Sequence, residues 1–127
     1  MKVLVTGCFD VVHIGHIRML EHAKSLGTTL FVAIDDDERV KKDKGESRPF
    51  NNVLERKEFL LALKPVDNVV IFSSDIDLEE VCRIYKPDIR VVGGDWYGKN
   101  IVGAKYCKKV IYFDKIPGYS TTRILSK

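Results

Sequence analysis

A chain of 127 residues can bury one sizeable core and is short for two, so we expect a single domain spanning residues 1–127. Hydrophobic residues make up 45% of the chain and charged residues 31%, which is ordinary for a soluble globular protein. The formal net charge is +3, which is well below the strong basic excess that is typical of a nucleic-acid binder, so we predict no nucleic-acid partner. A mild positive charge is equally compatible with a phosphorylated small molecule as ligand.

The first part of the chain alternates strand and helix patterns. Residues 3–5 are a short apolar run closed by Gly7, as expected of a buried parallel strand. Over residues 15–26 apolar side chains recur three positions apart and a glycine follows, which predicts a helix that stops there. Residues 30–34 (LFVAI) are predicted to form a second buried strand, followed by the acidic run 35–38.

A loop and a capped helix are predicted next. Residues 39–50 (RVKKDKGESRPF) are polar and basic and contain a glycine and a proline, so we expect a mobile surface loop. Asn52 is a plausible N-cap, and Glu55 stands at the third helical position, as in a capping box. This helix should end before Pro65.

The rest of the chain repeats the pattern. We predict strands at 69–72, 89–92 and 110–113 and a helix at 76–85. Residues 93–107 should form a glycine-containing loop with room for a short helix, and a brief helix should begin near Ser120. Strands separated by helices pair in parallel through right-handed crossovers. We therefore predict an α/β fold with a doubly wound parallel sheet of about five strands. Such a sheet binds ligands beyond the carboxyl ends of its strands, where the strand order reverses.

The cysteines and the absence of long apolar runs bear on location. Cys8, Cys82 and Cys107 include no C-x-x-C pair, which argues against a disulfide framework and favours a reducing compartment. The first ten residues reach Gly7 and Asp10 too early for a signal peptide, and no apolar run approaches the roughly 20 residues of a membrane span. We expect a cytoplasmic protein with no membrane partner.

The strongest chemical signal is the segment GCFDVVHIGH at residues 7–16, between the first strand and the first helix. His13 and His16 begin that helix, and Gly15 between them lets a ligand approach the backbone. The free N–H groups of a helix start attract an anion, and imidazoles there can donate hydrogen bonds to phosphoryl oxygens. A lone histidine is more often a packing or solvated residue. A metal site at the pair would lack a nearby third ligand, so we predict no metal-binding residues.

The segment resembles the G-x-F-D-x-x-H-x-G-H signature of the cytidylyltransferase-like nucleotidyltransferase superfamily. Residues 41–56, 94–95 and 119–123 (YSTTR) follow in the order of the family, so the resemblance spans nearly the whole chain and implies a Rossmann-like sheet. Residues 40–67, with their serine-arginine-proline stretch, and 86–96 (KPDIRVVGGDW) resemble the adenylyltransferase domain of ADP-heptose synthase. Glycerol-3-phosphate cytidylyltransferases share the histidine motif, a GDWYGK-like loop and the S-T-T ending, but lack the serine-arginine-proline stretch.

The resemblance implies site residues of three kinds. The catalytic residues would be His13 and His16, acting at the α-phosphate, with Lys44 and Arg123. The acceptor would contact Asp10, Lys44 and Arg56. The nucleotide would contact Gly7, Cys8, Phe9, Asp10, Gly15, Lys41, Gly94, Asp95, Tyr119, Ser120, Thr121 and Thr122.

Several of these residues have a structural alternative. Asp10 could close an Asx turn, the loop lysines could be solvated, and Arg56 could form a surface ion pair. Helix capping alone would explain Ser-Thr-Thr. The chain also departs from the family: Cys8 stands where threonine is usual, and Val92 stands where ADP-heptose synthase has a basic residue.

The resemblance implies a homodimeric enzyme that transfers a nucleoside monophosphate from ATP or CTP to a phosphorylated sugar or polyol, with Mg²⁺ as cofactor and release of pyrophosphate. The leading expectation is an adenylyltransferase like that for D-glycero-β-D-manno-heptose 1-phosphate. Glycerol-3-phosphate cytidylyltransferase, which uses CTP, is the alternative enzyme. A non-catalytic nucleotide-binding module is the alternative of another class.

Overall fold

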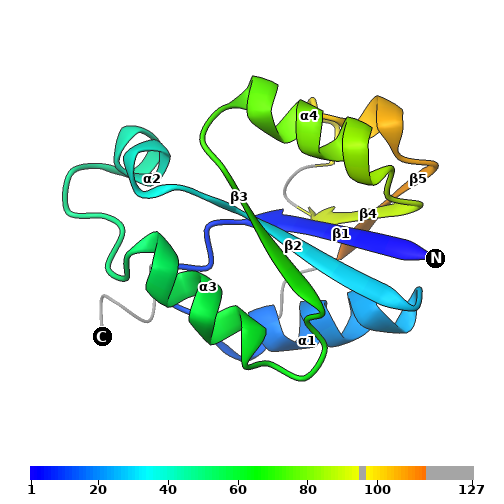
Figure 1. Cartoon of the computed structure of the whole chain (residues 1–127), viewed down its shortest axis with the longest axis horizontal. Helices are drawn as coiled ribbons and strands as arrows, with labels where there is room; N and C mark the ends of the chain where they lie inside the picture. Colours follow the sequence, from blue (N-terminus) through cyan, green and yellow to red (C-terminus); the bar gives the residue numbers. More distant parts are fainter. Residues whose placement is uncertain (95–96, 114–127) are drawn as a thin grey trace.

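The computed structural model describes residues 1–94 and 97–113. Its elements in chain order are β1 (Lys2–Gly7), α1 (Ile14–Ser25), β2 (Thr29–Asp35), α2 (Asp37–Lys44), α3 (Val53–Leu61), β3 (Asn68–Phe72), α4 (Asp75–Tyr85), β4 (Ile89–Gly93), the 3-10 helix η2 (Ala104–Tyr106) and β5 (Lys109–Phe113) (Figure 1). The predicted helix near residue 120 lies outside the described residues.

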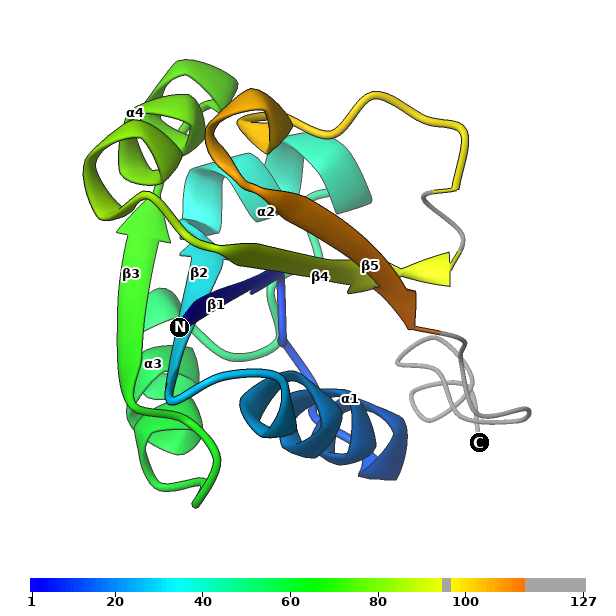
Figure 2. The same cartoon turned by 90° about the vertical axis from the view of Figure 1, so that its right-hand side faces the viewer.

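The five strands form one parallel sheet in the order β3-β2-β1-β4-β5, which confirms the predicted α/β class. Helices α1 and α3 cover one face, and α4 with η2 covers the other (Figures 1 and 2). Along the chain, β2 lies beside β1 and β3 lies beside β2. The next strand, β4, lies on the other side of β1. The strand order therefore reverses between β1 and β4, and a ligand is expected at their carboxyl ends.

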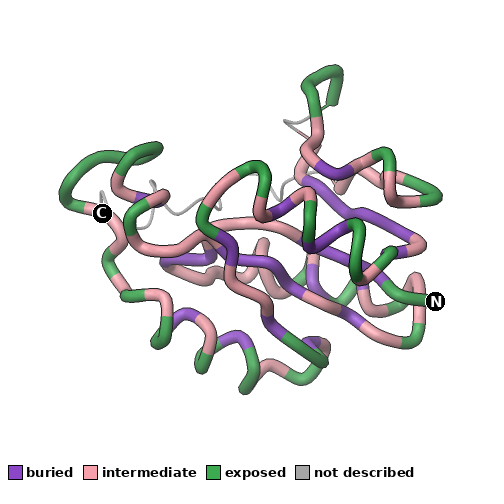
Figure 3. Tube along the Cα trace, turned by 45° about the horizontal axis from the view of Figure 1, so that its top comes forward, coloured by how far each residue is buried: buried purple, intermediate pink, exposed green. Residues whose placement is uncertain are grey.

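Side chains that alternate along each strand pack into a hydrophobic core on each face of the sheet. Val3 and Val5 of β1 pack with Leu20 of α1 and Leu60 of α3. Leu4, between the two valines, packs on the opposite face among residues of α4. Buried residues accordingly concentrate along the central strands (Figure 3). Packing on both faces therefore holds the carboxyl ends of the strands in place.

Helix α2 is a correction to the predicted loop at residues 39–50. The side chain of Asp36 caps α2 by accepting the N–H of Arg39 at 2.9 Å. Acidic residues occupy its first turn and lysines its last, which suits the helix dipole. The acidic run at 35–38, which follows the predicted strand, is therefore the start signal of a helix. The sequence pattern misses this helix because only Val40 of α2 is buried, so no apolar stripe marks it.

The predicted start of α3 is confirmed. Asn52 Oδ1 accepts the N–H of Glu55 at 2.9 Å, and Glu55 Oε1 accepts the N–H of Asn52 at 3.3 Å, which completes the capping box. Helix α3 ends at Leu61, a turn before Pro65. No helix among the described residues has both the length and the apolar character needed to cross a membrane.

Candidate active site

The two histidines themselves build the start of α1. His13 is the N-cap, and its Nδ1 accepts the N–H of Gly15 at 3.0 Å. His16 Nδ1 in turn accepts the N–H of His13 at 3.1 Å. This is a capping box in which imidazoles replace the usual hydroxyl and carboxylate. The two rings stack with their centroids 3.9 Å apart, so the pair forms one unit.

These hydrogen bonds also determine the proton position on each neutral ring. A ring nitrogen that accepts an amide hydrogen cannot carry a proton, so the neutral imidazoles hold their N–H on Nε2. Two Nε2–H donors thus stand beside a helix N-terminus, where the dipole also favours negative charge. A phosphoryl group that gains negative charge during transfer would be stabilised by such a pair.

Phe9 and Gly7 support the pair from the core side. Phe9 is buried with a left-handed φ of 51°, and its ring centroid lies 5.2 Å from that of His16. A Cβ on Gly7 would come within 2.8 Å of the Phe9 ring, so a side chain there would displace the ring. The structure therefore places both residues in the segment that presents the histidines.

Asp10 anchors the segment at residues 48–51. Its carboxylate accepts hydrogen bonds from Arg48 Nε and from the N–H groups of Phe50 and Asn51, each at 2.7 Å. Burial by itself raises the pKa of the Asp10 carboxyl, but the hydrogen bonds from Asn51, Phe50 and Arg48 prevail and lower that pKa. All these donors come from one segment, so Asp10 serves here as a loop anchor.

Arg56 is buried, with 1% of its surface exposed, and is not a surface ion pair. Its Nη1 donates to the carbonyl oxygens of Cys8 at 3.0 Å and Asp35 at 2.7 Å. Its Nε donates to Asn51 O at 3.1 Å, and its Nη2 pairs with Asp37 Oδ1 at 2.9 Å. One guanidinium thus joins the loop after β1, the end of β2, the start of α2 and the segment before α3.

The predicted phosphate-binding lysines lie on α2. Lys44 is the last residue of α2 and is exposed, whereas Lys41 is half-buried and lies 3.8 Å from Glu38 Oε1. Burial raises the pKa of the Cys8 thiol, and the charges of Arg56 and Lys44 act against that rise. The charge of Lys44 therefore acts on the loop that leads to the histidines.

The structure places Gly94 one residue beyond β4, half-buried at the carboxyl edge of the sheet. The other predicted residues lie outside the described part of the chain: Asp95, Tyr119, Ser120, Thr121, Thr122 and Arg123.

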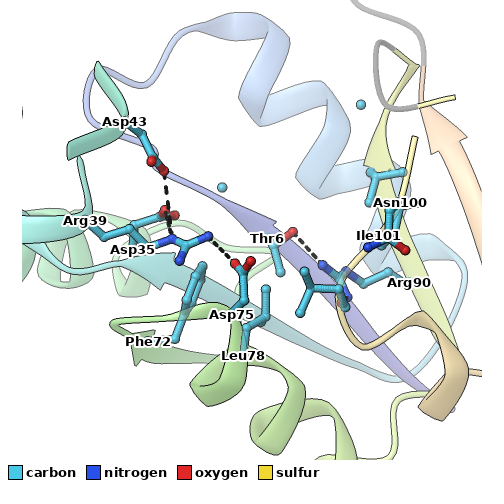
Figure 4. A pocket seen from close by; sticks show the side chains of 14 residues that line it. Thr6, Asp35, Arg39, Asp43, Phe72, Asp75, Leu78, Arg90, Asn100 and Ile101 are labelled. Carbon is cyan, nitrogen blue, oxygen red and sulfur yellow. Dashed lines mark hydrogen bonds and ion pairs between the residues drawn. The ribbon is translucent and has the colours of Figure 1, made fainter. Parts of the chain in front are cut away.

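A pocket of about 360 Å³ opens at the carboxyl ends of β1 to β4, on the side of α4 (Figure 4). Sequence reasoning missed its charged residues. Arg39 donates to Asp35 Oδ2 at 3.1 Å and Asp75 Oδ1 at 2.5 Å. Burial raises the pKa of Asp35, and Arg39 opposes that rise. Arg90 is buried at the opposite end, and the signal that could have revealed it is a charge inside an otherwise apolar strand.

Residues 1–94 and 97–113 hold no group of three or more histidine, cysteine or acidic side chains arranged to bind a metal ion. All three cysteines are free thiols.

Comparison with known proteins supplies the family. Bifunctional protein HldE from a Nitratiruptor species is 44% identical over 125 residues, which is 98% of this chain and 27% of that protein. Bifunctional protein HldE from Campylobacter jejuni subsp. doylei is 48% identical over the same length, again 98% of this chain and 27% of that protein. The chain therefore spans about a quarter of the length of these relatives.

A solved crystal structure is similar over the whole fold. The lipopolysaccharide core biosynthesis protein from Thermoplasma volcanium GSS1 is 26% identical with a TM-score of 0.68, covering 94% of this chain and 98% of that one. The model of the family described as "Cytidylyltransferase-like" matches residues 4–126, which include the histidine pair and the pocket. The chain belongs to the cytidylyltransferase-like family of nucleotidyltransferases.

Proposed function

We propose that the chain transfers AMP from ATP to the phosphate of a sugar phosphate, D-glycero-β-D-manno-heptose 1-phosphate or a close relative, and releases pyrophosphate. The observation that carries the proposal is the stacked histidine pair, whose Nδ1 hydrogen bonds leave both Nε2 atoms as donors at a helix N-terminus. The resemblance of residues 40–67 to the adenylyltransferase domain of ADP-heptose synthase favours ATP and a heptose phosphate. Similarity to a lipopolysaccharide core biosynthesis protein also favours a sugar phosphate over a polyol phosphate as the acceptor.

The mechanism follows from the charges involved. A phosphate oxygen of the acceptor attacks the α-phosphorus in line, and the bond from that phosphorus to the α,β-bridging oxygen breaks. The electron pair leaves with pyrophosphate. The acceptor oxygen is already anionic, so no base needs to remove a proton. His13 and His16 would donate their Nε2–H groups to the α-phosphoryl oxygens as negative charge accumulates there. Lys44 would neutralise the triphosphate or the acceptor phosphate.

Mg²⁺ belongs to the proposal as a companion of the nucleotide. The three hydrogen bonds that the Asp10 carboxylate accepts already occupy it, and the described residues form no three-ligand group. These residues do not fit a protein-built Mg²⁺ site. We propose that Mg²⁺ arrives held chiefly by the triphosphate oxygens and water, as Mg²⁺ often does at phosphate sites.

Pyrophosphate release tests the proposal. The wild-type protein would be incubated with ATP or CTP, each with heptose 1-phosphate or glycerol 3-phosphate. We expect release with ATP and heptose 1-phosphate. Release only with CTP and glycerol 3-phosphate would establish the glycerol-3-phosphate cytidylyltransferase alternative. ATP binding without release in any mixture would favour a non-catalytic binding module.

We also propose a cytoplasmic homodimer. The free thiols are compatible with a reducing compartment. Helix α3 exposes Leu54, Phe59 and Leu61, whose exposed fractions are 70%, 51% and 45%. Leu54 and Leu61 are seven positions apart and share one face of the helix, and exposed large apolar side chains on one face are typical of a surface that another protein copy covers. Sedimentation equilibrium should give twice the 14.5 kDa chain mass, and Leu54→Lys should shift it toward the monomer. A monomeric wild type would contradict the proposal.

A further inference from the structure

The pocket beside α4 has opposite chemical character at its two ends (Figure 4). At one end Asp35, Asp43 and Asp75 surround Arg39, whose guanidinium pairs with all three carboxylates. At the other end Arg90 lies beside Thr6, facing the same space. The first end offers carboxylate oxygens, which accept hydrogen bonds from hydroxyl groups. The second end offers a buried positive charge.

Arg90 differs from the other described arginines in lacking a carboxylate. Within residues 1–94 and 97–113, its five fellow arginines each form an ion pair with an acidic side chain. Arg90 forms none there, although only 2% of its surface is exposed. Its Nη1 donates to Val102 O at 2.7 Å and to Cys82 Sγ at 3.6 Å, and its Nη2 donates to Thr6 Oγ1 at 3.1 Å. Its buried Nε has no hydrogen-bond partner among the described residues.

A buried guanidinium with no carboxylate partner favours the binding of an anion. Burial lowers the pKa of Arg90, because removing the cation from water costs free energy, and the neighbouring thiols of Cys82 and Cys107 only partly oppose that shift. Hydrogen bonds to an ionised acceptor are roughly twice as strong as neutral ones, and a phosphate can accept from Nε and an Nη together. The Nε, which has no hydrogen-bond partner among the described residues, is therefore the donor that a bound phosphate would satisfy.

The thiol of Cys107 is the other candidate anion. Contact with Cys82 and the charge of Arg90 lower the pKa of Cys107 to about 7 against the opposing effect of burial. A Cys107 thiolate is the alternative partner of Arg90, and the Cys107→Ser variant distinguishes that partner from a bound phosphate.

We propose that this pocket binds the phosphorylated acceptor, with Arg90 holding the phosphate and the carboxylates of Asp35 and Asp75 accepting hydrogen bonds from its hydroxyl groups. This inference rests on the proposed function. A volume of about 360 Å³ lies in the range of small-molecule sites. The pocket lies where the strand order reverses, and its lining includes Gly7, at the start of the loop that carries the histidines.

The register of β4 directs Arg90 toward this pocket. Arg90 and Val92 are two residues apart on β4, so their side chains leave the same face of the strand, and both line the pocket. The strand therefore places the positive charge of Arg90 in the pocket.

Steady-state kinetics of the full chain test the inference. Arg90→Met removes the charge and fills a similar volume, Arg90→Lys keeps the charge, and Arg83→Met is the matched control on the exposed side of α4. Loss of a charged hydrogen-bond pair predicts that Arg90→Met raises KM for the acceptor by about 10- to 100-fold, with KM for ATP within about twofold of wild type. Arg90→Lys should recover part of the loss, and Arg83→Met and Cys107→Ser should match the wild type.

A measurement on the folded wild type avoids reliance on any variant's stability. The NMR signal of the Arg90 Nε–H, assigned by its absence in Arg90→Lys, should shift on titration with heptose 1-phosphate or glycerol 3-phosphate. It should not shift with the dephosphorylated compounds or with ATP. An unchanged signal would overturn the inference, and so would a KM effect on ATP in place of the acceptor, or an acceptor KM raised equally by Cys107→Ser. Absence of turnover in the wild type would refute the proposed function, while the NMR titration would still decide whether Arg90 binds phosphate.

Discussion

At the scale of single residues, His13 and His16 use different ring atoms for structure and for chemistry. Their Nδ1 atoms accept the amide hydrogens that complete the start of α1. Their Nε2 atoms are the donors proposed to act on the α-phosphate. The two roles are separable, because asparagine is a preferred N-cap and glutamine suits the third position of a capping box, but neither carries an imidazole Nε2–H.

We predict that His13→Asn and His16→Gln keep the fold and lose catalysis. Each variant should lower kcat by about 10²- to 10³-fold, the range found for removal of one transition-state donor. The free energy of unfolding should change by about 1 kcal/mol or less, because the cap acceptors remain. His22→Asn, in the last turn of the same helix, is the control and should match the wild type. Near-normal kcat in either variant would disprove the assigned role.

Arg56 illustrates a residue whose role depends on its burial. Arg56→Lys should lower the free energy of unfolding by about 2–4 kcal/mol, because an ammonium cannot replace a planar fork that serves four oxygens from separate segments. Urea denaturation measures the change. Arg83→Lys, on an exposed pair with Glu80, should cost no more than about 0.5 kcal/mol. An equal change in the free energy of unfolding for the two substitutions would contradict a structural role that depends on the burial of Arg56.

At the scale of elements, the Asp10 carboxylate accepts three of the hydrogen bonds that hold the segment at residues 48–51. The pKa of Asp10 is lowered in the folded protein, so its stabilisation is fully present above the unfolded value of about 3.9 and is lost as the pH falls through the folded value. We predict that the Phe50 and Asn51 amides keep their hydrogen-exchange protection factors down to about pH 4 and lose them at lower pH. In Asp10→Asn the protection should be weak at every pH. Hydrogen-exchange protection that depends neither on pH nor on the Asp10→Asn substitution would contradict the role of Asp10 as an anchor of this segment.

Sequence patterns predicted the elements with an apolar face and missed the one without. Strands β1 to β4 and helices α1, α3 and α4 each bury apolar side chains, β5 packs the partly buried Ile111 and Phe113 against the core, and the predicted bounds of these elements are close to the observed ones. Helix α2 buries only Val40 and depends on its Asp36 cap and its charges. Helix α2 forms because of local hydrogen bonds and charges, and its polar composition resembles that of a loop.

The candidate site divides in the same way. The histidine pair is local in sequence, so its spacing revealed it. Arg90 and Arg56 acquire their roles from groups that lie far along the chain: Arg90 meets Thr6, 84 positions away, and Arg56 meets Cys8, 48 positions away. Such partners depend on strand order and crossover geometry, which residue spacing does not encode.

At the scale of the whole molecule, the parallel sheet brings two separate sets of groups to one edge. The loop after β1 carries the histidines, and the ends of β1, β2 and β4 line the pocket that contains Arg90. We assign the α-phosphate to the first set and the acceptor to the second. Wild-type protein should therefore bind ATP and a sugar phosphate together, and calorimetry should show that saturating either ligand leaves a site for the other. Mutually exclusive binding would contradict two distinct subsites.

The central claim is that this chain joins an adenylate to a sugar phosphate. ³¹P NMR of wild-type protein with ATP, Mg²⁺ and heptose 1-phosphate follows every phosphorus atom in the reaction. We predict that a diphosphate-linked nucleotide sugar and pyrophosphate appear in equal amounts while ATP and the sugar phosphate disappear together. ATP left unconsumed, or AMP and pyrophosphate formed with the sugar phosphate untouched, would contradict the claim.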